Sequence, residues 1–380
     1  MQPLKRLVIV AGEESGDQHA STLVRQLKSR HPSIEITGIG GKHMQAAGVL
    51  LLSDLARFGV TGFIEVLRHL RVIRQAYRSI CAHLKENKPD LLILVDYPGF
   101  NLRLARFAKR TLGIRILYYI SPQIWAWKPG RINLIRECVD HMAVIFPFEK
   151  TLYEQAGVPV SFVGHPLVTH IDSAESTQPT RASLGLPRDK RLVAMLPGSR
   201  INEIERHMPV LRDTAIRLAT RYPDLHFVIP VAGTIDLALI QSYWPSHAPP
   251  CTFIQGHAID VATCSDCVVV SSGTASLECA LLSKPMCIIY KVSLLTCLIA
   301  SKLIRVKYLG LCNLLKNSMI VPELLQYDCN PTELTRVVSS LLSDPDATKD
   351  MQARLNDLKH TLSLAKADTT LHELVLQALF

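Results

Sequence analysis

Residues 267–282 read CVVVSSGTASLECALL, and this stretch predicts the fold class of the chain. The apolar run Cys267–Val270 is typical of a strand that is buried on both faces of a parallel sheet. A helix is expected over 275–282, directly after a turn of small residues. Strand, tight turn and helix in this order are typical of a doubly wound α/β domain.

The turn itself indicates a binding site for a nucleotide. Small side chains at 271–274 leave backbone N–H groups open to an anion, and the helix dipole favours negative charge there. Glu278 follows one turn later, where a carboxylate can accept hydrogen bonds from two sugar hydroxyls. The alternative is a small-residue turn that only lets the helix pack on the sheet.

The same alternation of apolar runs and amphipathic segments extends over most of the 380 residues. Strands are expected at 7–11, 34–39, 91–95, 115–120, 142–146 and 161–163, and in a second series at 192–196, 226–231, 252–254, 268–271 and 286–290. Helices are expected between them, for example at 19–29, 101–110 and 205–221. Such alternation predicts parallel sheets with right-handed crossovers.

A polar stretch at 169–190 separates the two series of strands and is the expected linker. We therefore predict two doubly wound domains, 1–168 and 191–345, which face each other across a cleft. The residues 346–380 are expected to form helices that pack on the second domain or cross back to the first. In such folds, ligands bind at the carboxyl ends of the strands.

The composition is that of a globular protein, with 48% hydrophobic and 20% charged residues. The net charge of +9 favours an acidic partner: nucleic acid, a phosphorylated substrate or an anionic membrane. The apolar run 7–11 is too short for a signal peptide, and no stretch is long enough to span a membrane. The ten cysteines are expected to be reduced thiols, and the CxxC at 264–267 lacks the partners of a zinc site.

Two loops after strands of the first series carry acidic residues. Gly12–Asp17 reads GEESGD, and its three acids would repel a pyrophosphate, so we expect it to meet sugar hydroxyls. The alternative is that Ser15 and Asp17 cap the following helix. Asp96 directly follows the strand at 91–95, where a partly buried acid can serve as a general base. Pro98-Gly99 equally favours a simple turn there.

Two further loops carry cations. Residues 121–131 read SPQIWAWKPGR. The two tryptophans can stack on sugars or bases, and Lys128 and Arg131 can bind phosphate. The alternative is that both tryptophan rings pack in the core. In Leu196–Arg200, Gly198 permits close approach of the backbone, and Arg200 can neutralise a diphosphate or remain a surface cation. The chain lacks Walker A and HExxH motifs and an Asp-x-Asp of the kind that commonly holds a metal–nucleotide pair, so we expect the diphosphate to be stabilised without a metal or cofactor.

A basic amphipathic segment at 63–84 is expected to contact a membrane surface, and 294–315 is similar. The residues predicted to face the lipid are Phe63, Leu67, Leu70, Arg71 and Arg74. The alternative is a helix packed in the core. Nucleic acid is not expected as a partner, because the basic residues lie among aliphatic side chains rather than stacking aromatics.

Four motifs together resemble those of lipid A disaccharide synthases: Gly12–Asp17, Ser121–Trp127, Leu196–Arg200 and Ser272–Glu278. The resemblance runs from near Leu7 to about Leu325. It implies an inverting glycosyltransferase with two Rossmann-like domains, the GT-B type. Such an enzyme joins UDP-2,3-diacylglucosamine to 2,3-diacylglucosamine 1-phosphate, and the products are a β-1,6-linked disaccharide and UDP.

The resemblance also implies a role for each candidate residue. Asp96 matches the base that deprotonates the acceptor 6-hydroxyl. The residues on the UDP side are Gly198, Ser199, Arg200, Ser272, Gly273, Thr274 and Glu278. The residues near the acceptor and its sugars are Glu13, Ser15, Gly16, Asp17 and Asn313. The chain departs from the family pattern at Gly99, where relatives usually have Asp, and at Cys312, where they usually have Pro.

The resemblance implies a cytoplasmic enzyme that associates peripherally with the inner membrane, and it leaves a homodimer open. Two other functions compete with the glycosyltransferase. A UDP-sugar epimerase of the same fold would need no surface that faces lipid. A peripheral membrane or polyanion-binding protein without catalysis would keep the basic segments but release no UDP.

Overall fold

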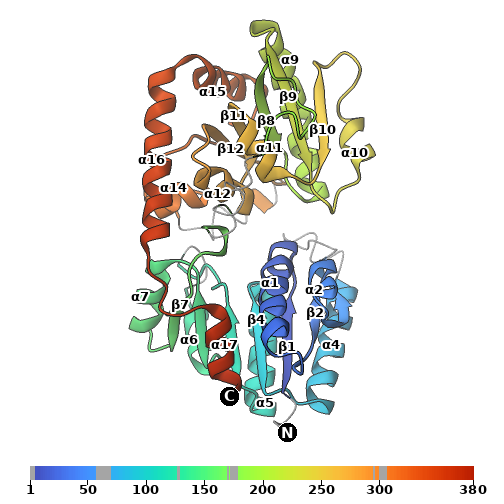
Figure 1. Cartoon of the computed structure of the whole chain (residues 1–380), viewed down its shortest axis with the longest axis vertical. Coiled ribbons are helices and arrows are strands. Elements are labelled where there is room, and N and C mark those ends of the chain that lie inside the picture. The colour runs from blue at the N-terminus through green and yellow to red at the C-terminus, as the bar shows by residue number, and fades with distance from the viewer. Residues whose placement is uncertain are drawn as a thin grey trace. The chain divides into compact units, whose positions relative to one another are not determined.

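The structure is a computed structural model that describes residues 5–56, 70–125, 129–168, 171, 179–293, 296–298 and 306–380 (Figure 1). The strands form one sheet of seven and one of six, and every neighbouring pair is parallel. The chain divides into two compact units: Met1–Pro166 with Ala365–Phe380, and Leu167–Leu364. The predicted fold class, two doubly wound α/β domains, is confirmed.

The first unit is built on a sheet with the strand order β3-β2-β1-β4-β5-β6-β7. Its strands are β1 (Arg6–Ala11), β2 (Glu35–Gly40), β3 (Leu50–Asp54), β4 (Leu91–Val95), β5 (Ile116–Tyr119), β6 (His141–Val144) and β7 (Val160–Phe162). Its helices are α1 (Glu14–Arg30), α2 (Lys42–Ala46), α4 (Leu70–Glu86), α5 (Pro98–Leu112), α6 (Arg131–Cys138), α7 (Pro147–Gln155) and α17 (Leu371–Leu379). Helix α5 packs between α4 and α6, whereas α1 contacts α2 and α17.

The second unit is built on a sheet with the strand order β10-β9-β8-β11-β12-β13. Its strands are β8 (Arg191–Leu196), β9 (Leu225–Val231), β10 (Cys251–Gln255), β11 (Cys267–Ser271), β12 (Met286–Tyr290) and β13 (Glu323–Leu325). Its helices are α9 (Ile201–Arg221), α10 (Leu237–Ser242), α11 (Ala258–Cys264), α12 (Thr274–Leu281), α14 (Leu311–Leu315), α15 (Pro331–Ser343) and α16 (Pro345–Leu364). Helix α9 packs against α15, and α12 packs against α11 and α16.

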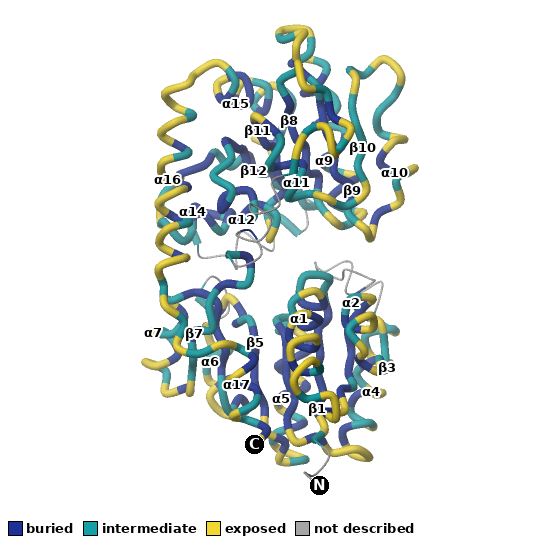
Figure 2. The backbone as a smooth tube through the Cα atoms, in the orientation of Figure 1, coloured by how far each residue is buried: buried dark blue, intermediate teal, exposed yellow. Residues whose placement is uncertain are grey.

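The central strands form because their side chains are apolar on both faces, as parallel sheets covered by helices require. All five residues of β4 and of β11 are buried, and Figure 2 draws β1 and β8 largely in dark blue. Every strand expected from the sequence is present within two residues of its expected bounds. The strands β3 and β13 were not predicted; both lie at sheet edges and are only partly buried, so they lack the continuous apolar signal.

Three helices begin at least three residues earlier than the sequence indicated, and α9, which begins at Ile201, is one of them. Helix α1 begins at Glu14 and α5 at Pro98, so most of the two acidic loops belongs to the first helical turns. Proline is favoured at the first position of a helix because its missing N–H would have no partner there. The side chains of Asp17 and Asn101 are therefore presented by helices rather than by free loops.

The last residues of the chain complete the first unit. Asp368 Oδ2 accepts a hydrogen bond of 2.8 Å from the backbone N–H of Phe162 at the end of β7. Arg115 Nη1 donates a bond of 2.9 Å to the carbonyl of Ala378, and the rings of His31 and Phe380 are 5.7 Å apart. Thr370 caps α17 with a reciprocal bond to Glu373. The unit is therefore assembled from two separate stretches of sequence.

Several sequence predictions fall on residues outside the described ranges. Phe63 and Leu67 belong to 57–69, and part of the second basic segment belongs to 294–295 and 299–305. In the expected linker, 179–190 is described, and Arg181 bonds there to Asp266 and to the carbonyl of Cys264. None of the helices within the described ranges has the length and apolar character needed to cross a membrane.

Candidate active site

Each sheet has one point where the strand order reverses, and the candidate residues follow the strands on either side of it. In the first sheet, β1 and β4 are paired, and Ala11 lies opposite Val95 at their carboxyl ends. In the second sheet, β8 and β11 are paired, and Leu196 lies opposite Val270. Ligands of doubly wound folds bind at such reversal points. Each unit therefore brings its two polar loops together at the expected place.

Asp96 lies in an unusual backbone conformation directly after β4. Asp96 has φ 45° and Tyr97 has φ 47°, so two consecutive residues with Cβ atoms are in the left-handed region. Each such residue costs about 1–2 kcal/mol, and such strain clusters at functional sites. The Asp96 residue is half-buried. The backbone here agrees with both interpretations from the sequence, an acid that follows a strand and a simple turn, because Asp96 directly follows β4 and begins the turn into α5.

The two loops of the first unit interlock at Gly12. A Cβ atom on Gly12 would lie 2.1 Å from Cδ1 of Tyr97, so the tyrosine ring needs a glycine there. Burial, together with the nearby Glu13 carboxylate, raises the pKa of Tyr97 to about 12, so its hydroxyl is neutral. Since Tyr97 follows Asp96, this contact fixes the acidic loop after β1 against the turn that carries Asp96.

Asp17 is completely buried and supports a neighbouring helix. Its Oδ1 accepts hydrogen bonds from the N–H groups of Gly41 at 2.7 Å and Met44 at 3.1 Å, and its Oδ2 accepts one from His43 at 2.9 Å. The side chain therefore caps α2 and not α1, the helix on which it lies. In this geometry Asp17 offers no surface to a sugar, which differs from the contact predicted from the sequence.

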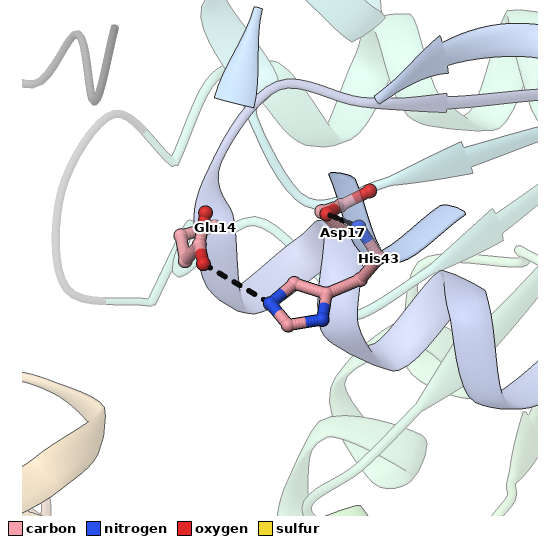
Figure 3. A group of neighbouring side chains, drawn as sticks. All are labelled: Glu14, Asp17 and His43. Atoms are coloured by element: carbon pink, nitrogen blue, oxygen red, sulfur yellow. Dashed lines mark hydrogen bonds and ion pairs between the residues drawn. The ribbon is translucent and has the colours of Figure 1, made fainter. Parts of the chain in front are cut away.

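Glu14, Asp17 and His43 form a compact cluster whose ligand-type atoms lie within 4.8 Å of one another (Figure 3). His43 Nε2 lies 3.1 Å and Lys42 Nζ 3.6 Å from Glu14 Oε1. The cluster does not fit a metal ion, because Asp17 is occupied by three N–H donors and Lys42 supplies a competing positive charge. Glu13, Glu14 and Ser15 are half-buried, so all three side chains keep some contact with solvent.

Trp125 of the motif at 121–131 is hydrogen-bonded to a buried acid, Glu149. Trp125 Nε1 donates a bond of 3.2 Å to Oε1 of Glu149, and its ring meets Phe148 edge-on at 5.3 Å. Ser121 Oγ lies 2.8 Å from the hydroxyl of Tyr153. These contacts agree with the packing interpretation for Trp125. Trp127 and Lys128 lie outside the described residues.

Glu149 makes the stability of the protein depend on pH. Its side chain is 1% exposed, and burial raises its pKa from 4.5 to about 7. Between these values the folded state binds more protons than the unfolded state, so stability falls as the pH rises through this window. Glu149→Gln removes the buried charge and keeps an acceptor for Trp125. We expect its melting temperature to exceed that of the wild type by several degrees at pH 8 and by much less at pH 5.

Thermal unfolding followed by circular dichroism at the two pH values measures this difference. Glu154→Gln is the matched control, because Glu154 lies on the same helix with its side chain 54% exposed. The control should show no such widening between pH 5 and pH 8. An advantage of Glu149→Gln that is equal at both pH values would contradict the assignment.

In the second unit, the loop after β8 is closed by a carboxylate of its own. Glu203 is buried; its Oε2 accepts a bond of 3.0 Å from the N–H of Ser199, and its Oε1 accepts one of 2.9 Å from Arg200 Nη1. Gly198 has φ 121°, and a Cβ atom there would lie 2.3 Å from Glu203 Oε2. Glu203 thus fixes the turn before α9, and Arg200, whose side chain is 31% exposed, is anchored at the start of that helix.

His207 joins the ends of two strands in the same unit. It is buried; its Nδ1 lies 2.6 Å from the carbonyl of Pro197, and its Nε2 accepts a bond of 3.0 Å from the N–H of Lys291. A carbonyl only accepts, so the proton is assigned to Nδ1; burial lowers the pKa and keeps the ring neutral. Glu203 and His207 were not predicted. The sequence did offer one signal for them: they are four residues apart in the first turns of the helix that follows the glycine loop, so both lie on the same face of that helix.

The N-terminus of α12 is open to solvent. Gly273 precedes the helix, no side chain caps it, and Gly273 and Thr274 are exposed. Ser272 is half-buried, and its Oγ lies 3.5 Å from the carbonyl of Leu309. Glu278 keeps some contact with solvent, but protein encloses most of its side chain, and this desolvation raises its pKa to about 7. The segment predicted to bind a nucleotide is therefore accessible.

Asn313 belongs to the second unit and is completely buried. Its Nδ2 donates to the carbonyl of Val321 at 2.8 Å and to Glu323 Oε1 at 2.7 Å. Its Oδ1 accepts from the N–H groups of Ile320 and Val321. Glu323 in turn accepts bonds from the N–H groups of Leu309 and Gly310. The amide is therefore fully used within the unit, which differs from the acceptor contact predicted for it.

The predicted membrane-facing residues that are described lie on α4. Leu70 is half-buried, and Arg71 and Arg74 are exposed. The opposite side of the helix is packed, since Ile80 and Leu84 are completely buried in the core of the first unit. The core-helix interpretation thus holds for the buried side of α4, and the arginines form a basic outer side.

Comparison with solved structures defines the class. The chain matches the UDP-GlcNAc 2-epimerase from Neisseria meningitidis with TM-score 0.60 and 12% identity, over 94% of this chain and 99% of that one. It matches the glycotransferase of kitacinnamycin with TM-score 0.63 and 15% identity over the full length of both chains. The fold is therefore that of the GT-B glycosyltransferases and the UDP-sugar epimerases that share it.

The sequence identifies the family within this class. Residues 7–378 match the model of the lipid-A-disaccharide synthetase family. A lipid-A-disaccharide synthase 1 of Legionella pneumophila is 58% identical over 100% of this chain and 99% of its own. The corresponding synthase of Geobacter metallireducens is 41% identical over 99% of this chain and 98% of its own. The chain belongs to the lipid-A-disaccharide synthetase family and is a glycosyltransferase, as the sequence motifs predicted.

Proposed function

We propose that the chain transfers 2,3-diacylglucosamine from UDP-2,3-diacylglucosamine to the 6-hydroxyl of 2,3-diacylglucosamine 1-phosphate. The observation that carries the proposal is the family match over residues 7–378, which includes all four loops at the two reversal points. The new glycosidic bond forms with inversion, and UDP leaves.

Asp96 is the proposed general base. Its carboxylate removes the proton of the acceptor 6-hydroxyl while the oxygen attacks the anomeric carbon, and the bond from that carbon to the diphosphate breaks. Inversion follows because the oxygen enters opposite the leaving diphosphate. The half-buried position of Asp96 after β4, beside the acidic loop, supports this role. Glu13 and Ser15 are the proposed contacts to the acceptor sugar, and Gly16, Asp17 and Asn313 act by supporting loops.

The UDP site is proposed at the paired ends of β8 and β11. Ser272, Gly273 and Thr274 offer the open N-terminus of α12 to the diphosphate, which the helix dipole favours. Arg200 neutralises the departing charge, and Gly198 and Ser199 supply its loop. Glu278 accepts hydrogen bonds from the ribose hydroxyls. The exposure of Gly273 and Thr274 at the start of α12 supports the choice of this helix for the anion.

UDP release on mixing the two acylated substrates with the purified chain tests the function. We expect stoichiometric UDP and disaccharide when both substrates are present, and no UDP when the acceptor is omitted. An epimerase would convert the UDP-sugar without any acceptor, and a protein that only binds membranes would release no UDP. Either result would overturn the proposal.

We further propose that the basic side of α4 contacts an anionic membrane surface, because Arg71 and Arg74 are exposed on it. Co-sedimentation with phosphatidylglycerol vesicles should be reduced in Arg71→Gln/Arg74→Gln. The matched control is Arg25→Gln/Arg30→Gln, which removes two exposed charges from α1. Equal sedimentation of the two double variants would contradict the role of α4.

A further inference from the structure

Two buried side chains hold the backbone carbonyl of Asp96. Tyr118 donates a hydrogen bond of 2.6 Å from its hydroxyl to this oxygen, and Asn101 donates one of 2.8 Å from Nδ2. We propose that Asn101 and Tyr118 are positioning residues that keep Asp96 in its left-handed conformation and so aim its carboxylate. The inference rests on the proposed role of Asp96 as the base.

The peptide groups on both sides of Asp96 are fixed by hydrogen bonds. Its N–H donates to the carbonyl of Tyr119 at 3.0 Å, which extends the ladder between β4 and β5. Its carbonyl is held by Tyr118 from β5 and by Asn101 from α5. Because these peptide planes set φ and ψ of Asp96, they also set the direction of its Cα–Cβ bond.

Asn101 additionally ties the ends of the two strands at the reversal point. Its Nδ2 lies 3.1 Å from the carbonyl of Val95 and 3.4 Å from that of Val10, so three carbonyl oxygens surround one amide nitrogen. The orientation of the amide follows from this environment, since the opposite orientation would place Oδ1 against three acceptors. The residue thus links β1, β4 and the turn that carries Asp96.

The arrangement keeps an unfavourable feature that stability alone does not explain. Both side chains are completely buried, yet Oδ1 of Asn101 has no hydrogen-bond partner among the described residues. A buried acceptor without a partner is costly, as is the left-handed pair Asp96-Tyr97. An apolar residue at 101 would avoid the first cost, so the amide is expected to serve the geometry of Asp96.

Tyr118→Phe and Asn101→Leu test the inference in the full-length enzyme. Each removes donors to the Asp96 carbonyl while retaining much of the buried volume. We expect kcat to fall by about 10-fold and about 100-fold respectively, because small displacements of a reacting group have effects of this order. The affinity for UDP should stay unchanged, since its proposed site lies in the other unit. A retained melting transition shows that a variant is folded.

Tyr119→Phe is the matched control. Tyr119 is the next residue on β5 and is 4% exposed, and no hydrogen bond joins its hydroxyl to a described residue. Its kcat should equal that of the wild type. A loss in Tyr119→Phe as large as that in Tyr118→Phe would overturn the inference, because any lost buried hydroxyl would then suffice.

The decisive measurement repeats the substitutions in an Asp96→Asn background. Positioning residues act through Asp96, so Tyr118→Phe should lower the residual turnover of Asp96→Asn by less than twofold. A further tenfold loss would overturn the inference and leave the base intact. If Asp96→Asn alone kept full turnover, the base role and the inference would both fail. If Asp96→Asn were inactive while Tyr118→Phe and Asn101→Leu kept the wild-type kcat, only the inference would fail.

Discussion

Asp96→Asn should lower kcat by about 10²- to 10⁴-fold, the range typical of removing a general base. The amide has nearly the shape of the carboxylate but cannot take the proton of the acceptor hydroxyl. The left-handed backbone is expected to survive, because Asn tolerates this region at least as well as Asp. The loss should therefore appear in turnover and not in folding.

UDP formation under saturating concentrations of both substrates measures this loss. Asp90→Asn is the matched control, because Asp90 is exposed and lies at the opposite, amino end of β4, where it accepts a bond from the N–H of Arg6. The control should keep the wild-type kcat. Full turnover by a correctly folded Asp96→Asn would exclude Asp96 as the base.

Arg200→Ala should lower kcat by about 10²- to 10³-fold, comparable with the loss of a group that stabilises developing charge. The departing UDP carries the charge that forms as the glycosidic bond breaks, and Arg200 is the proposed counter-charge. The substitution also deprives the buried Glu203 of its positively charged partner, so repulsion between Glu203 and the diphosphate should weaken UDP binding. Arg200→Lys should recover part of the loss, because it restores charge without the planar fork.

Calorimetric titration with UDP separates the binding effect from the effect on kcat. The control is Arg212→Ala, on the same helix but remote from its N-terminus, where the arginine pairs with Asp213. Its UDP affinity and kcat should match the wild type. Unchanged kcat in Arg200→Ala would place the counter-charge for the leaving group elsewhere.

The sequence predicted the strands whose residues are all buried, but it did not predict two strands that are only partly buried. The run Cys267–Ser271 predicted β11 because all its residues are apolar or small and buried. The run Leu50–Asp54 did not predict β3 because it lies at the edge of the sheet, where burial is incomplete; Leu50 is 68% exposed. The family followed from motifs, which depend on residue identity rather than on burial.

The detailed roles of polar residues were less predictable because their partners are set by the tertiary fold. Asp17 caps a helix whose N–H groups lie 24 to 27 positions later in the sequence. Asn313 bonds to a loop and a strand that are brought beside it only when β13 adds to the sheet. The left-handed conformation of Asp96 depends on Tyr118 and Asn101. None of these partners is implied by the residue types alone.

The composition of the first unit from two separate stretches has a consequence for biosynthesis. Residues 365–380, which supply α17 and Asp368, are translated only after the whole of Leu167–Leu364. At rates of about 5–20 residues per second, the amino-terminal portion waits roughly 10–40 s on the ribosome for its final helix. During that interval the surface of α1 that α17 later covers is exposed to chaperones and neighbouring nascent chains. The first unit can therefore complete its packing only after residues 365–380 have been synthesised.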